Sequence, residues 1–394
     1  MTTLPELLSL FRNDARVQRI AQALHAPSAR VQVSGAIGSS QALVATSVTE
    51  AMGGVHVFVL TDREEAAYFM NDLEALRAEV GDTPGAARRK RGEELMFFPA
   101  PSRSPYDPDG HHDGERVSRT EVLEVLMKRQ QMEGTGPLLI IVTHPEALVP
   151  LVVGREAMQK NTLTVKRNEE LPIETLEEWL HETGFTRVEF VYEPGQFSVR
   201  GGIVDVFSYG NDKPYRIELY GDTVESVRRF DPQDQLTVER LAEAVIVPDL
   251  QDEDAARQQL FFAQLPETAT IWLRDLQAIG DAATKQLKLL GESYDRLPDK
   301  DKHPPPGDLL ATDSALIKGL LGFRKVFLAS GPRLQATGRT VHEPEAWSLK
   351  PGAELIDFQH RPQPTFAKEF KVLSGDLHNK QNAGYTNLIA CNSA

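Results

Sequence analysis

Two segments in the first part of the chain combine a continuous apolar run with a helical pattern, and this alternation most constrains the fold. The apolar run at 54–60 leads into an amphipathic pattern that extends to residue 76, and residues 136–150 repeat the scheme. Thr61, with Glu64 three residues later, is predicted to cap the first of these helices. Strands that are apolar on both faces and alternate with helices are typical of a parallel sheet covered on both sides. The sequence therefore predicts an α/β fold.

A glycine-rich turn at 33–47, VSGAIGSSQALVATS, has the outline of a phosphate-binding loop. Such a loop reads G-x-x-x-x-G-K-[ST], in which the lysine neutralises phosphate and the hydroxyl binds Mg²⁺. Aligned from Gly35, with Gly38 inside the turn, the chain has Ser40, Gln41 and Ala42 at the last three positions. Backbone amides and the helix dipole remain able to attract an anion. We expect no nucleotide hydrolysis, and a glycine turn without a ligand is the simpler interpretation.

The alternation of continuous apolar strands with helices ends near residue 155. Residues 161–185 predict a strand and a helix that begins near Pro172, and residues 186–231 contain short alternating strands. Turn signals at 210–212 (GND) and 220–222 (YGD) separate these strands. The segment predicts a compact antiparallel α+β unit.

Buried strands return after this unit, at 268–279 and 324–334. They most simply complete the first sheet, so we expect the α+β unit to be an insertion. After about Gly352 the pattern gives one strand, one helix and one apolar strand, a set too small to close a core. We therefore expect a fragment that ends inside a further domain.

Composition limits the classes of function. The formal net charge of −14 provides no whole-chain basic field for nucleic acid. Cys391 is the single cysteine, which excludes an internal disulfide and a cysteine metal cluster and fits a reducing cytoplasm. His111 and His112 lie in an acidic stretch without a third suitably spaced ligand, so we expect a solvated loop and no metal. No catalytic triad pattern is found, and we expect no catalytic residue.

The most distinctive stretch, residues 193–231, places two arginines and an aromatic residue on neighbouring strands. Arg216 and Tyr220 share a face because strand side chains alternate, and Arg200 lies on a neighbouring strand. Arginine beside an aromatic is typical of the hot spots of protein interfaces. The alternative is that both arginines are ordinary surface residues paired with Glu218 or Asp222.

Two motifs within this stretch, FSVRGGIVDVF at 197–207 and YRIELYGDTVESVRRFD at 215–231, closely resemble a known domain. It is the UvrA-binding domain shared by UvrB and the bacterial transcription-repair coupling factors (Mfd). UvrB has an intact phosphate-binding loop and, after the position that matches Tyr106, a long aromatic hairpin that clamps damaged DNA. Here the loop has lost its nucleotide residues, and no such hairpin fits before the helix near Glu115. The chain therefore resembles the N-terminal UvrB-like module of the coupling factors.

The resemblance implies the domain organisation. A RecA-like, P-loop NTPase-like domain would comprise residues 1–154 and 249–345, interrupted by the UvrA-binding domain at 155–248. Residues 352–394 would start an incomplete small α/β domain. UvrA would be bound by Arg200, Arg216 and Tyr220, although the family commonly has Phe where Tyr220 stands.

The resemblance also implies a role in transcription-coupled nucleotide excision repair in the cytoplasm. The chain would recruit UvrA without catalysis and without a cofactor. The parent protein would displace stalled RNA polymerase from double-stranded DNA, with an ATP- and Mg-dependent translocase motor outside this chain. A C-terminal autoinhibitory domain of the parent would cover the UvrA-binding face.

Two other functions stay open. A UvrB-like ATP-dependent damaged-DNA-binding protein would require a lysine at position 41 and a hairpin after Tyr106. A structural role, as an inhibitory lid on the parent motor, is compatible with recruitment and is not separated from it by the sequence.

Overall fold

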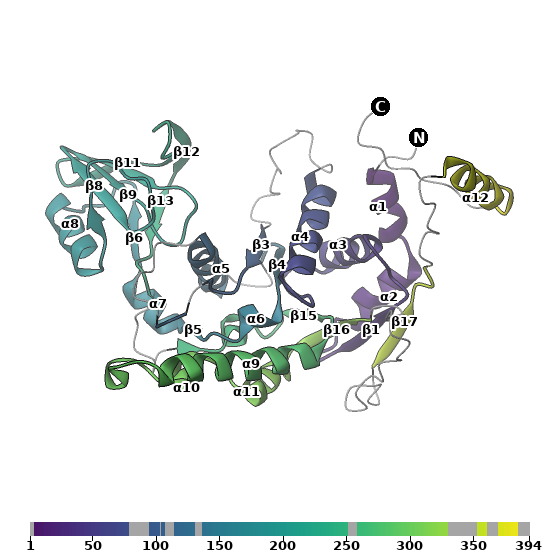
Figure 1. The fold of residues 1–394 in the computed structure, drawn as a ribbon. Helices are drawn as coiled ribbons and strands as arrows, with labels where there is room; N and C mark the ends of the chain where they lie inside the picture. Colours follow the sequence, from purple (N-terminus) through teal and green to yellow (C-terminus); the bar gives the residue numbers. More distant parts are fainter. Residues whose placement is uncertain are drawn as a thin grey trace.

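The computed structural model describes residues 4–78, 94–102, 104–106, 114–130, 136–250, 258–329, 353–360 and 369–384 of the 394-residue chain. Within them the two largest sheets have seven and six strands. Figure 1 shows the six-stranded sheet at one end of the molecule, with the seven-stranded sheet beside it. Among these residues no helix combines the length and apolar character that a membrane span needs.

The seven-stranded sheet is parallel and combines segments from both sides of the middle unit. Its strands are β1 (Arg30–Ser34), β2 (Val55–Val59), β3 (Glu94–Phe98), β4 (Leu139–Thr143), β15 (Thr270–Leu273), β16 (Arg324–Leu328) and β17 (Glu354–Asp357). They lie in the order β17-β1-β16-β15-β2-β4-β3, and every adjacent pair is parallel. Because β15 and β16 lie between β1 and β2, the predictions of a parallel sheet and of an inserted α+β unit are confirmed.

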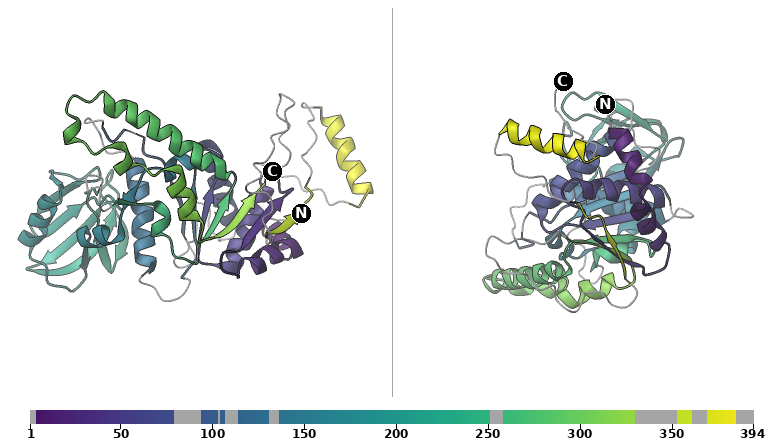
Figure 2. Two further views of the ribbon diagram at one scale, coloured as in Figure 1. Left: turned by 90° about the horizontal axis from the view of Figure 1, so that it is seen from below. Right: turned by 90° about the vertical axis from the view of Figure 1, so that its right-hand side faces the viewer.

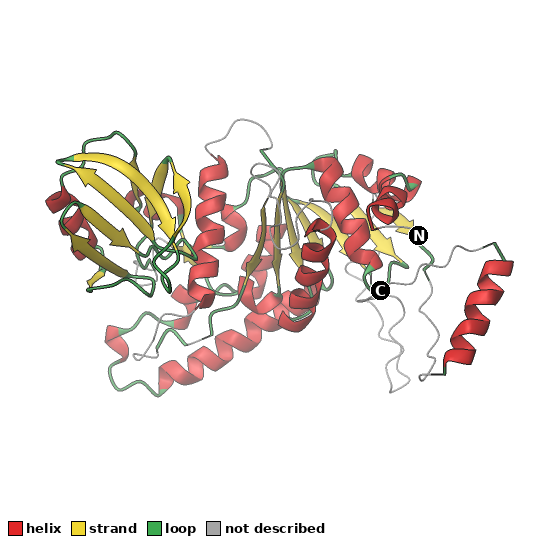
Figure 3. Ribbon diagram, turned by 90° about the horizontal axis from the view of Figure 1, so that it is seen from above, coloured by secondary structure: helices red, strands yellow, loops and turns green. Residues whose placement is uncertain are grey.

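Helices cover both faces of this sheet (Figure 3). The core on one face is shared with α1 (Leu4–Arg12), α2 (Ala15–Ala23), α3 (Ser40–Met52) and α4 (Arg63–Ala78). The core on the other face is shared with α5 (Gly114–Gln130), α6 (Pro145–Leu148), α9 (Leu276–Asp295) and α11 (Asp313–Leu320). Helix α9 runs along the outside of the second face (Figure 2). Burial on both faces explains why these strands are continuously apolar.

The cap of α4 differs from the predicted one by a residue. Asp62 Oδ1 accepts a hydrogen bond from the Glu65 amide at 2.8 Å, and Glu65 Oε2 accepts one from the Thr61 amide at 2.9 Å. The predicted pair of Thr61 with Glu64 is therefore wrong. Asp62 brings a full negative charge to the positive end of the helix, which a threonine hydroxyl lacks.

Strand β17 completes the edge of the seven-stranded sheet. It pairs in parallel with β1, with Val31 opposite Glu354 and Ser34 opposite Asp357. This corrects the assignment of residues 354–357 to a further domain: β1 would otherwise present unpaired backbone groups at the sheet edge. Helix α12 (Phe370–Asn382) follows. The other predicted domain boundaries stay predictions.

The middle unit is built on the six-stranded sheet. Its strands are β7 (Thr186–Arg187), β8 (Gln196–Arg200), β9 (Ile203–Val206), β10 (Tyr215–Tyr220), β11 (Thr223–Phe230) and β12 (Thr237–Leu241). They lie in the order β12-β11-β10-β9-β8-β7, antiparallel except for the β7–β8 pair. Helix α8 (Ile173–Glu182), which begins after Pro172 as predicted, packs with the ribbon of β6 (Leu163–Lys166) and β13 (Glu243–Ile246) on one face.

Short elements connect these units. They are β5 (Val152–Val153), α7 (Arg155–Asn161), β14 (Gln258–Gln259), α10 (Pro306–Leu309) and two 3₁₀ turns, Phe261–Gln264 and Lys300–Lys302. Arg116 of α5 pairs with Asp249 at 2.5 Å, directly after the middle unit. Burial raises the pKa of Glu124, also on α5, while Lys128 and Arg229 of β11 oppose that effect. The Arg116–Asp249 pair thus links α5 to the segment that follows β13, and Glu124 of α5 experiences the charge of Arg229 on β11.

We predict a pH-dependent stability from His56 in the core. Its Nδ1 accepts a hydrogen bond from Trp272 Nε1 at 3.1 Å, and burial lowers its pKa from 6.5 to about 4. Between pH 7 and pH 5 the proton therefore binds mainly to the unfolded chain, and the free energy of unfolding falls by about 2 kcal/mol. Urea unfolding of the His56→Gln variant should lack this contribution. The exposed His378→Gln serves as control, and equal pH dependence in both variants would contradict the prediction.

Candidate functional site

The hairpin between β8 and β9 is formed by the sequence Arg200-Gly201-Gly202, the RGG motif. Gly201 has φ of +60°, a conformation that favours glycine. A Cβ on Gly202 would lie 2.6 Å from the carbonyl oxygen of Leu219 on β10, so only glycine fits there. The Leu219 amide also donates to Gly202 O at 2.7 Å. The motif therefore places Arg200, the last residue of β8, at the end of the sheet where β10 also ends.

Alternation along β10 divides its side chains between two faces. Tyr215, Ile217 and Leu219 are buried against α8, whereas Arg216 and Tyr220 lie on the opposite side. We call this opposite side the outer face. The prediction that Arg216 and Tyr220 share a face is confirmed. Cross-strand pairing places further side chains on the outer face: Arg200, Asp205, Glu218, Ser226, Arg228 and Arg240.

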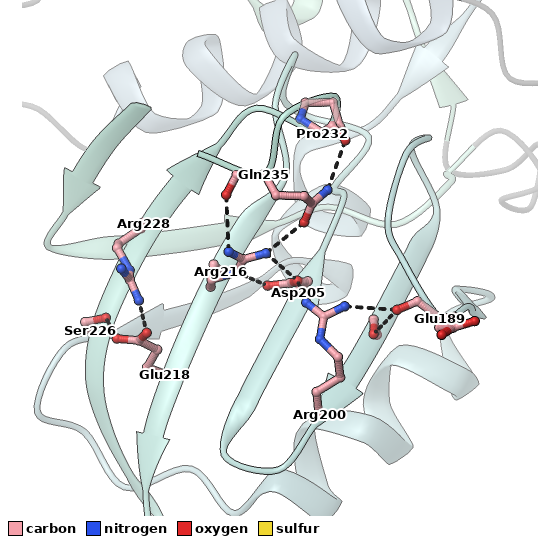
Figure 4. Close-up of polar contacts among 10 residues, drawn as sticks. Glu189, Arg200, Asp205, Arg216, Glu218, Ser226, Arg228, Pro232 and Gln235 are labelled. Carbon is pink, nitrogen blue, oxygen red and sulfur yellow. Dashed lines mark hydrogen bonds and ion pairs between the residues drawn. The ribbon is translucent and has the colours of Figure 1, made fainter. Parts of the chain in front are cut away.

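A buried carboxylate joins the two arginines that the sequence singled out (Figure 4). The side chain of Asp205 is 1% exposed, and its Oδ2 lies 2.5 Å from Arg200 Nη2. Arg216 reaches it twice, with Nε to Oδ1 at 2.7 Å and Nη2 to Oδ2 at 2.9 Å. The alternative that Glu218 or Asp222 pairs with the arginines is wrong, because Asp205 stands directly opposite Arg216 in the β9–β10 register.

Arg216 is held almost entirely by its own chain. Its Nη2 also donates to Gln235 Oε1 at 2.9 Å, and its guanidinium lies 4.3 Å from the ring centre of Phe230. The side chain is 16% exposed, and the hydrogen bonds that it donates to Asp205 raise its pKa. Arg216 therefore stays charged while it connects β9 to the segment that precedes β12.

Arg200 and Tyr220 face solvent more openly. The Arg200 side chain is 37% exposed, with Nη1 3.0 Å from the carbonyl oxygen of Glu189 and its guanidinium 5.1 Å from the ring centre of Phe190. Tyr220 is 83% exposed, unusual for a large aromatic residue. An exposed ring and an oriented guanidinium on one face have the composition of an interface hot spot.

A second ion pair lies on the same face. Glu218 pairs with Arg228 across β10 and β11, and Ser226 Oγ donates to Glu218 Oε2 at 2.6 Å. Thus Arg228, like Arg216, has its carboxylate within the sheet (Figure 4).

The glycine-rich loop after β1 is filled by the chain itself. Gly35 has φ of +67°, and a Cβ there would lie 2.3 Å from Asp357 Oδ1 and 2.6 Å from the Gln359 amide. The His360 amide donates to Gly35 O at 2.9 Å. The segment after β17 therefore lies against the turn that a phosphate would occupy in a working loop.

Ser40 closes the loop locally. Its hydroxyl accepts from the Ile37 amide at 3.0 Å and lies 3.0 Å from His360 Nδ1. Burial, and secondarily the nearby Arg16, lower the pKa of His360. Gly38, with φ of +55°, allows the turn between Ile37 and α3. An amide that could face phosphate is thus bound to the serine.

Gln41, at the position of the phosphate-binding lysine, points back into the protein. It is 6% exposed, its Nε2 donates to the Ala36 carbonyl at 2.6 Å, and its Oε1 accepts from Arg274. Arg274 also pairs with Glu65 of α4 at 2.8 Å. Ala42 is buried in the core of the same helix. These positions serve packing and internal hydrogen bonding.

Comparisons with known proteins identify the middle unit. Residues 163–251 match the UvrB interaction domain. The middle unit is thus similar to that domain over these residues. The match contains the whole outer face, and it confirms the resemblance inferred from residues 197–231.

The chain is also similar to proteins named transcription-repair-coupling factor. It is 32% identical to the one from Myxococcus xanthus over 56% of this chain and 17% of the relative. It is 29% identical to the one from Haemophilus influenzae over 54% of this chain and 19% of the relative. It is 28% identical to the one from Escherichia coli over 48% of this chain and 16% of the relative. The matched region thus spans less than a fifth of the length of these relatives.

The sequence analysis missed Asp205, which holds both Arg200 and Arg216, and Gln235, which holds Arg216. Asp205 interrupts the apolar pattern IVDVF, which is a signal for a buried polar role. Gln235 has φ of +62° in a connection and carries no comparable signal. His111, His112 and the segment directly after Tyr106 lie outside the described residues.

We predict that Asp205→Asn destabilises the UvrB interaction domain by about 3 kcal/mol, because it leaves two arginines without their shared carboxylate. Glu218→Gln, which alters a more exposed ion pair, should cost below about 1 kcal/mol. Urea unfolding at pH 7 measures both. Equal midpoints for the two variants would show that Asp205 does not organise the face.

We predict that the double variant Ser40→Gly/Gln41→Lys gains no nucleotide affinity, although it restores the Gly-Lys pair of a phosphate-binding loop. Asp357 and Gln359 would still fill the turn, and the carboxylate would repel phosphate. Calorimetric titration with Mg-ATP tests this. Saturable binding at micromolar concentrations would disprove it.

Proposed function

We propose that this chain is a UvrA-recruiting module that acts in transcription-coupled nucleotide excision repair. The match of residues 163–251 to the UvrB interaction domain supports the proposal, as does the similarity to transcription-repair-coupling factors. The observation that carries it is Tyr220, 83% exposed on the same face of that unit as the oriented arginines. An aromatic side chain in this setting gains free energy when a partner covers it.

The proposed contacts follow from the exposure of each residue. Tyr220 inserts into an apolar site on UvrA, and Arg200 offers its exposed guanidinium to a UvrA carboxylate. Arg216, already bound to Asp205 and Gln235, supports the face and has little free surface of its own. Asp205 binds Arg200 and Arg216 at the same time, so the Arg200 side chain is already held before UvrA binds. This reduces the conformational entropy lost on association.

We further propose that recruitment needs no nucleotide or other cofactor in this chain and no catalytic residue. The internally bonded Ser40 and Gln41 support this view. The single cysteine supports a cytoplasmic location. In a longer parent protein, RNA polymerase displacement on double-stranded DNA would be the task of an ATP-dependent motor elsewhere, and a C-terminal domain of that parent would cover the outer face.

We expect the purified chain to bind UvrA, and Tyr220→Ala to weaken binding about 30-fold, equivalent to about 2 kcal/mol. Isothermal titration calorimetry with purified UvrA measures the change. Tyr68→Ala is the matched control, since Tyr68 is 67% exposed on α4, outside the UvrB interaction domain. No UvrA binding by the unaltered chain would refute the proposed function, and equal affinities of the two variants would refute the assignment of the face.

The alternative, a UvrB-like ATPase that binds damaged DNA, is not favoured by the comparisons. Steady-state ATP hydrolysis by the purified chain, abolished by Gly35→Ala, would revive it. A thermal-stability measurement on this variant is needed alongside, because a Cβ at Gly35 meets Asp357.

A further inference from the structure

A row of arginines crosses the outer face and ends at its edge. In the register of the sheet Asp205 stands opposite Arg216, Arg216 opposite Arg228, and Arg228 opposite Arg240. The last of these belongs to β12, the terminal strand of the sheet. Three cationic side chains on adjacent strands would repel one another unless carboxylates or a partner balance their charge.

Two of the three have carboxylates within the sheet. Arg216 pairs with Asp205, and Arg228 pairs with Glu218. Arg240 is exposed, and no ion pair joins it to any residue in the described part of the chain. Arg240 therefore adds a positive charge, unpaired among the described residues, on β12 at one edge of the outer face, to the charge that Arg200 and Arg216 leave because they share one carboxylate.

Apolar surface accompanies this charge. Val238, two residues before Arg240 on β12, is 55% exposed. Leu236, in the connection that leads into the strand, is 65% exposed. With Tyr220, these residues are exposed apolar groups on β10, on β12 and in the connection that leads into β12. A cation beside apolar groups fits a partner surface with a carboxylate at the rim of an apolar patch.

The connection into β12 is held in place before any partner binds. Gln235 receives two hydrogen bonds from Arg216, at its side-chain oxygen (2.9 Å) and its carbonyl oxygen (3.4 Å). The Gln235 and Asp231 backbones are joined at 2.8 Å, and Asp231 pairs with Lys213 at 2.9 Å. An exposed strand with an anchored entry presents its side chains at little entropic cost.

We propose that β12 is the second part of the docking face, where Arg240 pairs with a carboxylate of an acidic partner surface and Val238 packs beside it. This proposal rests on the proposed function and makes UvrA the partner. It extends the contact beyond Arg200, Arg216 and Tyr220, to a strand that the sequence did not single out.

Charge reversal at the edge strand tests the proposal. The full chain with Arg240→Glu is titrated into purified UvrA by calorimetry, at low and at moderate salt. We expect affinity to fall at least tenfold at low salt, and the loss of affinity with added salt to be smaller than for the unaltered chain, because an attractive pair has become repulsive. Val238→Asp should also weaken binding.

Lys288→Glu is the matched control. It makes the same change in net charge at an exposed position on α9, which packs on the seven-stranded sheet, and it should bind UvrA like the unaltered chain. Urea unfolding midpoints of all variants confirm that the fold is retained. If Arg240→Glu proves unfolded, Arg240→Gln takes its place, with a smaller expected loss of affinity.

The outcomes separate the two proposals. If Tyr220→Ala weakens UvrA binding while Arg240→Glu and Val238→Asp leave it unchanged, the role of β12 is refuted and the proposed function stands. Equal losses for Arg240→Glu and Lys288→Glu also refute it, because the effect would then be one of net charge. If the unaltered chain does not bind UvrA, the proposed function is refuted. The proposal that β12 contacts UvrA is then refuted as well.

Discussion

The buried carboxylate of Asp205 organises the outer face. Two arginines, on the strands either side of β9, converge on one side chain that is 1% exposed, so both guanidiniums are held and one of their two positive charges is balanced inside the sheet. Through Arg216 the same carboxylate is linked to Gln235 and the entry to β12. A face built in this way presents Arg200 in a defined position, on the same side of the sheet as the exposed Tyr220.

Contacts within the chain also account for the state of the glycine-rich loop after β1. The turn of a phosphate-binding loop is retained because the parallel sheet needs a tight passage from β1 to α3. Its interior is taken up by residues 357–360, and its amide and side-chain groups bond to Ser40, His360 and Arg274. Residues of the chain itself therefore fill the loop, whereas the outer face of the six-stranded sheet is exposed in the part of the chain that the structure describes.

Much of this architecture could be predicted from the sequence. Continuous apolar runs predicted the parallel sheet, and the return of such runs after residue 268 predicted the insertion. Period-two alternation placed Arg216 and Tyr220 on one face. The failures involve competition between neighbours: Asp62 caps α4 in place of Thr61, and β17 joins β1 in place of a further domain. Local patterns do not show which of two adjacent polar residues caps a helix, or which edge strand a short apolar run will pair with.

The sequence by itself determined the type of the main elements, the turns at 210–212 and 220–222 and the loss of the phosphate-binding side chains, because these depend on residue identity and short-range periodicity. Only the tertiary structure decided that Asp205 unites the arginines, that residues 357–360 occupy the glycine turn, and that Arg240 is left without a carboxylate among the described residues. Each of these depends on strand register or on contacts between distant segments. Such contacts arise only when the whole chain has folded.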